Sequence, residues 1–582
     1  MTTSTAQVNF DDPRPSAWPP VWMIWKNPIV RRYCHSRLRL RGLGIWLLVT
    51  LLISGFIFFA ARSASIHQGE MELVDAERTA LIPLLVFQGI ILFLLGTGQV
   101  AGGMTAESDE GVIDYQRLAP MSPLAKVLGY LFGLPIREYV LVLATMPFTL
   151  WGLWRGEVPW GISVQLYGVF FTSGILYHLT GLVAGTVVKN KRWAFLVSMA
   201  VVFLLYTVIP QLANFGLVYF RYLTIMPVLE ESWPYLIQRT AGAAVISVQN
   251  LLPKASFFDL NFPQVVFTVF SQIALILTGI AMLWRRWRRA ESHLLGKLWA
   301  ILVFAWVQIV LLGNALPLIE PGYLFPSRGL DRFTGRFRTG DWSPQIWEAG
   351  AIVVTFGLST LAMLWIITVM ITPNRETRLR GWRKARKLNR SWLSPLSDPA
   401  TSWPWVVTMV TIGVAGWYVF AKAVVEAHWF PGQLLHPRAL PAFALVLMTG
   451  GLGFHAILEG RGGRAAGLAA IFIGVVPIMA GTILAIVNEE LPAPAIWMGA
   501  ISPLAGVFLS SSISMGLPDV SPELYRAIPR AFWFWQVLGV LVLLRLTLAL
   551  RKSLRTTANV ADEREPLPEF EAPEEGERLP AG

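Results

Sequence analysis

Charged residues are scarce in this chain: Asp, Glu, Lys and Arg make up 14% of its 582 residues, against roughly 25% in soluble domains. A soluble fold of this composition would have too little polar surface to cover itself. Hydrophobic residues account for 54% of the chain, and the mean hydropathy is +0.54. The composition therefore excludes an ordinary soluble protein and favours lipid as the main solvent of the chain.

Cysteine, histidine and nucleotide-binding motifs are also scarce. The single cysteine, Cys34, excludes an intrachain disulfide, and the seven histidines lack the spacing of a metal-ligand set. No G-x-x-x-x-G-K-[ST] motif occurs, so no phosphate-cradling loop is predicted. The polar start, Met1–Pro20, lacks the apolar core of a signal peptide. We expect no metal and no cofactor bound by this chain itself.

Twelve apolar segments are long enough to cross a bilayer as helices, which takes about 20 residues each. They are residues 43–61, 80–102, 127–151, 161–188, 193–213, 263–284, 298–319, 349–371, 405–427, 440–458, 465–487 and 531–550. Helices satisfy their own backbone groups in lipid, and the short alternating runs typical of a barrel are absent from the sequence. The sequence predicts an all-α polytopic membrane protein with about 12 transmembrane helices, arranged as two six-helix halves.

Basic clusters predict the orientation of these helices. Lys and Arg gather in alternate loops, such as Lys189–Arg192, Arg285–Arg289 and Arg375–Arg390, and such loops face the cytoplasm. This pattern explains the net charge of +12 without nucleic acid. One outside loop, Glu320–Trp347, fits poorly because it carries four arginines. We expect a multi-pass protein of the cytoplasmic (inner) membrane, with both termini cytoplasmic.

Four parts follow from this topology. Residues 1–42 form a cytoplasmic N-terminus with an amphipathic entry helix, residues 43–289 and 290–555 form the two halves, and residues 556–582 form an acidic tail. The tail cannot bury a core and is expected to be disordered. Prolines interrupt residues 496–515, which are predicted to lie outside or to re-enter the membrane. Residues 241–258 hold the same position in the first half.

The loop after the second span is the first functional candidate. An apolar helix runs into an acidic stretch, and a short segment with apolar residues follows until Pro120 and Pro123 stop it. This pattern predicts a short interfacial helix between two spans, suited to take a push from a soluble partner. An ordinary loop is the alternative.

The same loop carries a family resemblance. Its order of acidic residues, glycine, leucine, proline and serine resembles the loop after the second span in the type-2 ABC exporter permeases; the matching residues are Glu107, Glu110, Gly111, Leu118, Pro120 and Ser122. The segment Trp25–Arg32, with its Asn-Pro pair, is similar to the family's entry helix. The chain departs from the family in two places. Lys126 and Gly129 are present but do not form the family's adjacent Gly-Lys pair, and Arg31 and Arg32 follow Pro28 where the family usually has an acidic residue.

The resemblance covers residues 25–289 and implies a function. It implies ATP-driven export in which a separate cytoplasmic ABC ATPase subunit binds ATP and docks on the entry helix and the loop. The chain itself would not be an enzyme. Its partners would be membrane lipid and either a second copy of the chain, as a homodimer, or other permease subunits. Because few charges lie in the predicted bundle, a lipid, lipid-linked or amphiphilic cargo is favoured.

Six polar residues within spans are further candidates, because ionisable groups in lipid are functional by default: Arg137, Glu138, His178, Lys422, Glu426 and His455. Neighbours on a helix point to different faces, so Arg137 and Glu138 are not expected to pair. Lys422 and Glu426, four residues apart, are expected to form a pair. The two histidines are expected to be hydrogen-bonded structural residues, with a proton relay as the alternative.

Two other functions compete with transport. A polytopic transferase acting on lipid-linked substrates would need an outer carboxylate, and the only candidates are Glu70, Glu72, Asp75 and Glu77. They lack a paired-acid signature, and an acidic outside loop is expected in any case. A non-transporting membrane scaffold for other subunits is the second alternative.

Overall fold

The computed structural model describes residues 23–67, 71–237, 254–289, 292–328, 342–390, 392–487, 492–515 and 522–560. The chain divides into two compact units. The first consists mainly of residues 1–213, 218–256 and 260–290, and the second mainly of residues 291–582. Most of the acidic tail, Glu70, and most of residues 241–258 lie outside the described residues.

Ten helical runs in the described part of the chain are long and apolar enough to cross a membrane. They are Leu40–His67, Leu73–Asp109, Trp160–Gly185, Gln264–Arg288, Lys297–Leu318, Ile346–Ile371, Trp403–Val425, Ala439–Arg461, Gly463–Val487 and Pro522–Val560. An all-α multi-pass membrane fold is therefore confirmed. The third predicted span is a pair of helices bent by 50°, and the fifth is a helix of 17 residues followed by a short one. The total of twelve stays a prediction.

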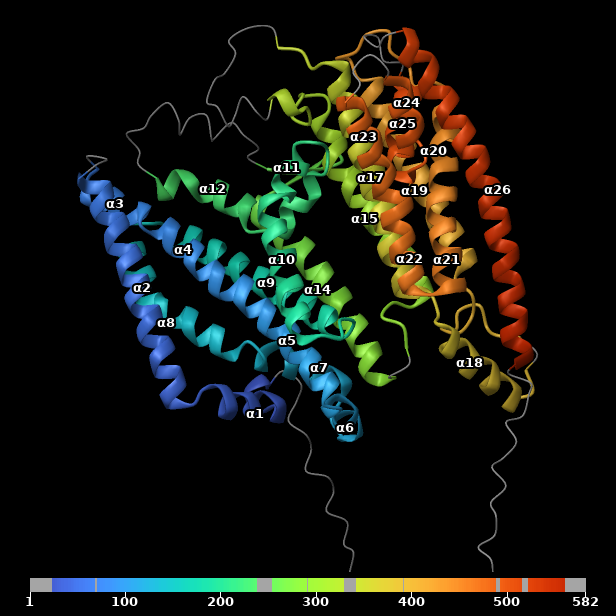
Figure 1. Cartoon of the computed structure of the whole chain (residues 1–582). Helices are drawn as coiled ribbons and strands as arrows, with labels where there is room; N and C mark the ends of the chain where they lie inside the picture. Colours follow the sequence, from blue (N-terminus) through green and yellow to red (C-terminus); the bar gives the residue numbers. More distant parts are fainter. Residues whose placement is uncertain are drawn as a thin grey trace, which may run out of the picture. The chain divides into compact units, whose positions relative to one another are not determined.

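The first unit is built around α5, which packs against α9 and α10 (Figure 1). Its elements are η1 (Ile24–Lys26), α1 (Pro28–Arg37), α2 (Leu40–His67), α3 (Leu73–Thr79), α4 (Leu81–Gly89), η2 (Ile90–Leu95), α5 (Gly96–Asp109), α6 (Val112–Leu118), α7 (Pro123–Gly133), α8 (Ile136–Arg155), α9 (Trp160–Gly185), α10 (Lys191–Thr207), α11 (Ile209–Ala213), η3 (Val218–Leu223), α12 (Met226–Leu236), β1 (Ala255–Phe257), β2 (Leu260–Phe262) and α14 (Gln264–Arg288). Leu92, Phe93, Phe170 and Tyr177 form part of its buried core.

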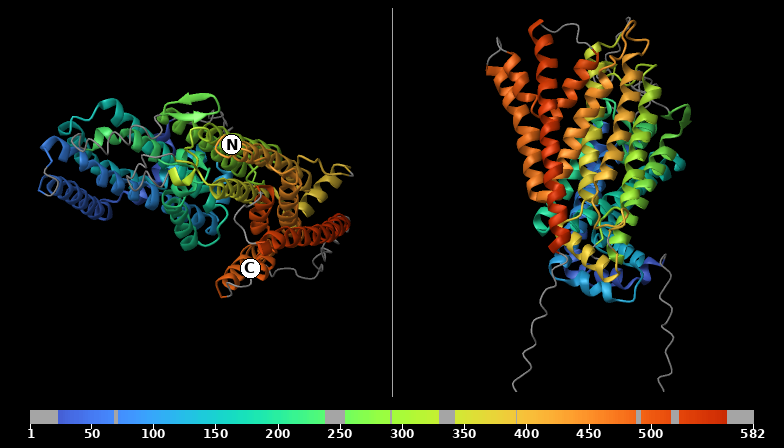
Figure 2. Two further views of the ribbon diagram at one scale, coloured as in Figure 1. Left: turned by 90° about the horizontal axis from the view of Figure 1, so that it is seen from above. Right: turned by 90° about the vertical axis from the view of Figure 1, so that its right-hand side faces the viewer.

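The second unit places α19 against α15 and α17, and its long helices run side by side (Figure 2). Its elements are α15 (Lys297–Ala315), η4 (Leu316–Leu318), α17 (Ile346–Ile371), α18 (Arg375–Lys387), α19 (Trp403–Val425), α20 (Ala439–Leu447), η5 (Met448–Leu452), α21 (Gly453–Arg461), α22 (Gly463–Ala469), η6 (Ala470–Val475), α23 (Val476–Val487), α24 (Pro492–Gly499), α25 (Pro503–Met515) and α26 (Pro522–Val560). Residues 496–515 thus fall on α24 and α25, both shorter than a span.

Three of the long helices contain a π-helical segment: η2, η5 and η6. A π turn widens the helix and presents its carbonyl oxygens to neighbouring side chains. His178 Nε2 lies 2.9 Å from the Leu92 oxygen, and the Trp365 indole donates to the Gly450 oxygen at 3.1 Å. Ser502 Oγ donates to the Gly474 oxygen at 2.5 Å. Each π segment is therefore tied to another part of its unit by a hydrogen bond.

A buried lysine begins the second unit's first helix. Lys297 is 2% exposed, and its ammonium donates to the carbonyl oxygens of Ala400 at 2.6 Å and Ser397 at 2.8 Å. The carbonyl oxygens of Pro395 and Thr401 each lie at 3.3 Å. Because a buried ammonium needs several acceptors, this residue holds the loop before α19 against the start of α15.

Replacing Ser502 by alanine tests the role of the π-segment contacts. Ser502→Ala removes both the donor to the Gly474 oxygen and the cap of α25, where the hydroxyl accepts the Leu504 N–H at 3.1 Å. It should lower the free energy of unfolding by about 2 kcal/mol. The matched control is Ser512→Ala, because the Ser512 hydroxyl bonds only the carbonyl of Phe508 in its own helix. Thermal unfolding in detergent should show a lower midpoint for the first variant alone. Equal midpoints would contradict the structural role.

Candidate functional site

Glu107, near the end of α5, is the centre of a polar cluster in the first unit. Its carboxylate accepts hydrogen bonds from the guanidinium of Arg32 and from the hydroxyls of Tyr33 and Tyr130. The Glu107 side chain is only 12% exposed, so these three donors satisfy a largely desolvated charge. Burial and the neighbouring carboxylate raise the pKa of the Tyr33 phenol, which keeps it protonated as a donor.

The entry helix α1 is held in place by its cap and by glycines on α7. Asn27 Oδ1 accepts the Ile29 N–H at 3.0 Å, and its amide donates to the Ala125 oxygen at 2.7 Å. A Cβ at Gly129 would lie 2.8 Å from Asn27 Oδ1, and one at Gly133 would lie 2.7 Å from the Tyr33 ring. Only glycine permits this approach. Side chains of α1 and its cap therefore pack directly on the backbone of α7 beside Glu107.

The turn after α5 fixes both ends of the short helix α6. Gly111 precedes α6 with φ +71°, a left-handed conformation that favours glycine. At the other end the Lys126 ammonium donates to the carbonyl oxygens of Ala119 at 3.0 Å and Arg117 at 3.3 Å. Ser122 caps α7 by accepting the Ala125 N–H at 3.2 Å. The predicted interfacial helix is therefore present, and it is rigidly connected to the long helices on either side.

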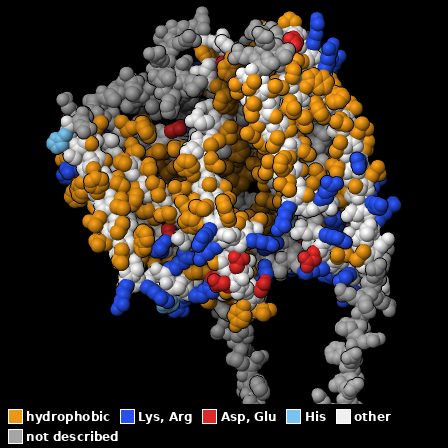
Figure 3. Space-filling view, in the orientation of Figure 1, with side chains coloured by type: hydrophobic (Ala, Val, Ile, Leu, Met, Phe, Trp, Pro, Cys, Tyr) orange, Lys and Arg blue, Asp and Glu red, His pale blue; other side chains and the backbone are white. Residues whose placement is uncertain are grey.

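The outer face of α6 carries large apolar side chains that no described residue of its unit covers. Tyr115 is 77% exposed and Leu118 is 83% exposed, whereas Ile113 is buried against the unit. Five of the six residues predicted for docking are exposed as well: Glu110, Gly111, Leu118, Pro120 and Ser122. Glu107 is the exception, because it faces the cluster with α1 and α7. Lys, Arg, Asp and Glu side chains gather at this end of the unit, while hydrophobic side chains cover the helices beyond it (Figure 3).

The last helix of the first unit joins the same cluster. The Trp287 ring of α14 stacks on Tyr130, with centroids 5.4 Å apart and planes 21° apart. The cationic groups of Arg117 and Lys126 each lie 6.0 Å from the Trp287 ring centroid, within range of a cation–π interaction. Sequence analysis missed Arg32, Tyr33, Tyr130 and Trp287 as site residues. The only signal for them in the sequence was Glu107 itself: an acidic residue at the end of a span needs hydrogen-bond donors from neighbouring residues.

The expectation that Arg137 and Glu138 do not pair is wrong. The Arg137 guanidinium donates twice to Glu138 Oε1, at 2.7 Å and 3.1 Å. Both residues lie in the first turn of α8, directly after the bend. Glu138 is 1% exposed. The long arginine side chain folds back onto its neighbour. The free energy gained by pairing a buried carboxylate with a cation exceeds the cost of this side-chain conformation.

The expectation that Lys422 and Glu426 form an ion pair is also wrong. The helix α19 ends at Val425, so Glu426 lies beyond its last turn. Its carboxylate accepts the Leu435 N–H at 3.4 Å. No ion pair joins the two side chains, both of which belong to the described residues. Glu426 is the C-cap of α19, and its side chain turns to the loop after the helix instead of back to Lys422.

Both candidate histidines are fully buried and have polar neighbours. His178 binds the Tyr139 hydroxyl at 2.9 Å in addition to the Leu92 carbonyl, so both of its ring nitrogens are used. His455 Nε2 lies 2.9 Å from the Glu459 carboxylate. That carboxylate also accepts the Thr401 hydroxyl at 2.9 Å, while Arg378 donates to the Glu459 main-chain oxygen at 2.6 Å. The sequence did not indicate Glu459 or Arg378.

Two of the four acids that a transferase would need are occupied in structural contacts. Glu77 is buried and pairs with Arg62 at 2.9 Å, and Asp75 lies 3.4 Å from Arg78. No group of three or more potential metal ligands occurs among the residues that the structure describes. Of the three candidate acids that the structure describes, only Glu72 is therefore outside an ion pair.

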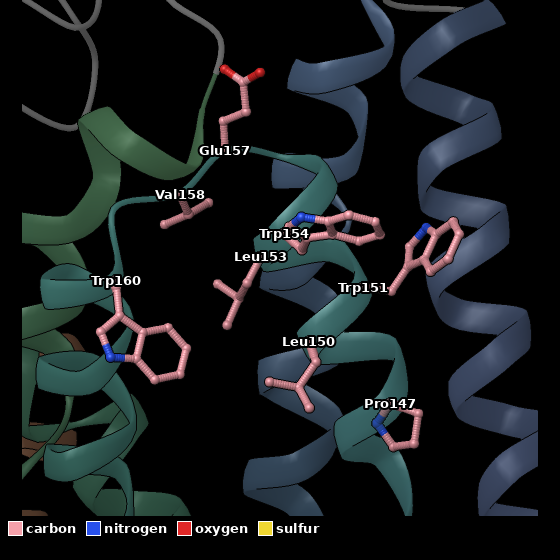
Figure 4. Close-up of a pocket in the computed structure, with 8 residues that line it drawn as sticks. All are labelled: Pro147, Leu150, Trp151, Leu153, Trp154, Glu157, Val158 and Trp160. Atoms are coloured by element: carbon pink, nitrogen blue, oxygen red, sulfur yellow. The ribbon is translucent and has the colours of Figure 1, made fainter.

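A tryptophan-lined groove of about 810 Å³ lies between the end of α8 and the start of α9 (Figure 4). Trp154 and Trp160 border it and are largely exposed, as is typical of the membrane–water boundary. Two main-chain hydrogen bonds close the end of α8. The Glu157 N–H donates to the Trp154 oxygen at 3.2 Å, and the Val158 N–H donates to the Leu153 oxygen at 3.1 Å. Glu157 has φ +50° in this turn, where glycine is favoured.

Glu157→Gly should therefore stabilise the first unit by about 1 kcal/mol, because glycine adopts positive φ without a Cβ clash. Thermal unfolding of the purified protein in detergent measures the effect. Glu231→Gly, in the interior of α12 and exposed, is the control and should destabilise. A loss of stability in Glu157→Gly would show that the carboxylate makes a favourable contact that outweighs the backbone strain.

The Glu107 cluster is tested by Glu107→Gln, which keeps the shape of the side chain and removes its charge. The guanidinium of Arg32 then lacks its counter-charge, so the free energy of unfolding should fall by about 2 kcal/mol. Amide hydrogen exchange in α1 should be faster. The matched control is Glu110→Gln, whose side chain is exposed and should change neither quantity. Unchanged exchange in α1 would contradict the role of the cluster.

No family model, no curated protein and no solved structure matches this chain. Its function is therefore inferred from its own residues and their arrangement.

Proposed function

We propose that the chain is the membrane-spanning permease subunit of an ATP-driven ABC-type exporter in the cytoplasmic membrane. A separate cytoplasmic ATPase subunit would bind ATP and dock on the outer face of α6. About twelve spans in two six-helix halves and cytoplasmic termini belong to the same proposal. The sequence contributes the resemblance over residues 25–289 and the absence of a phosphate-binding motif.

The observation that supports this proposal is the exposed apolar face of a short helix that is fixed at both ends. Tyr115 and Leu118 project from α6 beside the acidic residues Glu110 and Asp114. Exposed aromatic and aliphatic side chains in a polar setting are typical of a protein interface. A basic, partly apolar groove on a soluble partner would complement this face.

The connections of α6 would transmit a displacement into the membrane. A force on α6 reaches α5 through Gly111 and reaches α7 through the Lys126 contacts, without a long flexible loop on either side. The π segment η2 and the 50° bend between α7 and α8 are the positions where these helices depart from regular geometry. Such positions absorb changes in helix direction. The cargo favoured by so apolar a bundle is a lipid or another amphiphile.

The alternatives are a transferase and a scaffold. The transferase is disfavoured because Glu77 and Asp75 are engaged with arginines. A scaffold that binds other subunits without transport would use the same α6 face. It differs from the permease in the identity of the partner, since only a permease requires an ATPase.

The test is co-purification with an ATPase. The tagged protein is solubilised gently from its native membrane, and the eluate is assayed for ATP hydrolysis. In the variant Tyr115→Ser with Leu118→Ser, two apolar side chains no longer enter the interface. Binding should weaken by about 100-fold, equivalent to about 3 kcal/mol. The matched control is Tyr525→Ser with Leu434→Ser, which alters equally exposed side chains elsewhere.

Loss of ATPase from the α6 variant and its retention by the control would support the permease. If the intact chain brings down no ATPase, the permease proposal fails. If both variants retain the ATPase equally, an ATPase binds but α6 is not its docking site.

A further inference from the structure

The second unit contains a cavity of about 280 Å³ next to two of its π segments. Its walls come from η5, α21, η6 and α26, with Trp365 of α17 and the start of α25. In Figure 1, α26 runs beside α21. Among the residues that the structure describes, no Asp, Glu, Lys or Arg belongs to the lining, which is mostly apolar. The cavity lies in membrane-spanning helices, so only molecules dissolved in the membrane can reach it.

The cavity opens sideways toward the hydrocarbon region. Ile473 on η6 is 47% exposed and Val542 on α26 is 48% exposed, and both line the cavity. The helices that carry them are among those least covered by the rest of the unit. In the most apolar 18-residue stretch of each helix, 17% of the residues are buried in Gly463–Val487 and 11% in Pro522–Val560. A lipid chain can therefore enter from the side without unfolding a packed core.

One polar pair lies inside this apolar surface. Thr449 Oγ1 lies 2.8 Å from the Leu445 oxygen of its own helix and 3.1 Å from Gln536 Oε1. Thr449 and Gln536 both line the cavity. Gln536 is buried, and its amide nitrogen has no acceptor among the described side chains and main-chain groups. A donor that borders an apolar cavity without an acceptor is unfavourable. A ligand oxygen in the cavity would supply the acceptor.

The glycines in the wall show that the space is real. Gly453 is buried, yet a Cβ built on it would have no atom within 4 Å. At Gly474 the nearest atoms would lie 3.8 Å away. Both glycines line the cavity. A larger side chain at either position would therefore fill the cavity instead of displacing a neighbour.

We propose that this cavity binds one neutral lipid: a hydrocarbon chain that carries a single oxygen head group, an alcohol or ketone, whose oxygen accepts from the Gln536 amide. A charged head group is excluded because no residue of the lining could compensate its charge. Thr449 lies 10 residues after the start and 12 before the end of Ala439–Arg461. At 1.5 Å per residue, Thr449 lies roughly 15 Å from one end of the helix and roughly 18 Å from the other.

That depth distinguishes the occupant from a phospholipid, whose phosphate stays at the membrane boundary. The volume is near the lower limit of ligand pockets, about 300 Å³. It therefore admits the head group and the first part of one chain, while the rest extends along α26 into the bilayer. The site does not require the ATPase partner proposed above, so each can fail without the other.

Photolabelling tests the site on the full-length protein in phospholipid nanodiscs. The probe is hexadecanol with a diazirine close to its hydroxyl, and labelled peptides are identified by mass spectrometry. We expect labels on η5–α21, η6 and the middle of α26, and we expect unlabelled hexadecanol to compete with them. A diazirine phospholipid should not label these segments. If it does and the alcohol does not, the occupant is a phospholipid and the proposal is overturned.

Filling the cavity provides the matched comparison. Gly453→Leu should reduce labelling by at least about tenfold, because a few methylene groups in an apolar pocket change ligand binding by about this factor. Gly467→Leu is the control, because its Cβ also meets no atom but the residue does not line the cavity. Gly474→Leu provides a second filled variant if the first fails to fold, as judged by gel filtration. Equal labelling in the filled and control variants would overturn the proposal.

Gln536→Leu tests the polar contact separately. It removes the amide donor, so labelling by the alcohol at limiting probe concentration should fall about fivefold, as for one neutral hydrogen bond. Labelling by a diazirine hexadecane without the hydroxyl should stay the same. If both probes lose label equally, the cavity has changed shape, and the assigned role of Gln536 is wrong.

Discussion

In lipid, every main-chain polar group must find its partner within the protein, and the packing of both units depends on this constraint. The π segments η2, η5 and η6 present carbonyl oxygens to side chains outside their own helices. His178, Trp365 and Ser502 supply the donors. Because apolar surfaces contribute little specificity between helices in a membrane, these bonds fix which helices lie together. The cavity of the second unit lies beside two of the widened segments.

The two units use a similar device at the end of a π-containing span. In the first unit, the helix that includes η2 ends near Glu107, which binds Arg32 from the amphipathic helix α1. In the second unit, the helix that includes η5 ends near Glu459, which contacts Arg378 from the amphipathic helix α18. In both, a carboxylate holds a short basic helix. The burial that lowers the pKa of Arg378 is opposed by this carboxylate.

The spans were the most predictable part of the structure, because a run of about 20 apolar residues has few alternatives to a membrane helix. The turn around α6 was predictable from Gly111, Pro120 and Ser122, since their effects on the backbone are local. The direction of Glu107 was not predictable. Its partners Tyr130 and Arg32 lie 23 and 75 positions away in the sequence, and only tertiary packing brings them together.

The two wrong expectations have local physical reasons. Pairing of Arg137 with Glu138 was missed because helix geometry was considered without the length of the arginine side chain. The pair between Lys422 and Glu426 was expected because the helix was assumed to continue past Val425. The cavity could not have been found from the sequence, because Gly453 and Gly474 look like other small residues of a membrane helix.

Lys297 has a consequence for the order in which the second unit is made. Its ammonium lies at the start of α15, but the carbonyl oxygens that bind it come from Pro395, Ser397, Ala400 and Thr401, between 98 and 104 positions later. At a synthesis rate of about 5–20 residues per second, these oxygens emerge roughly 5–20 s after the lysine. During that interval the new helix has a charge without its acceptors. Water or lipid phosphate must therefore solvate the ammonium, and α15 can reach its final depth only after the loop before α19 has been made.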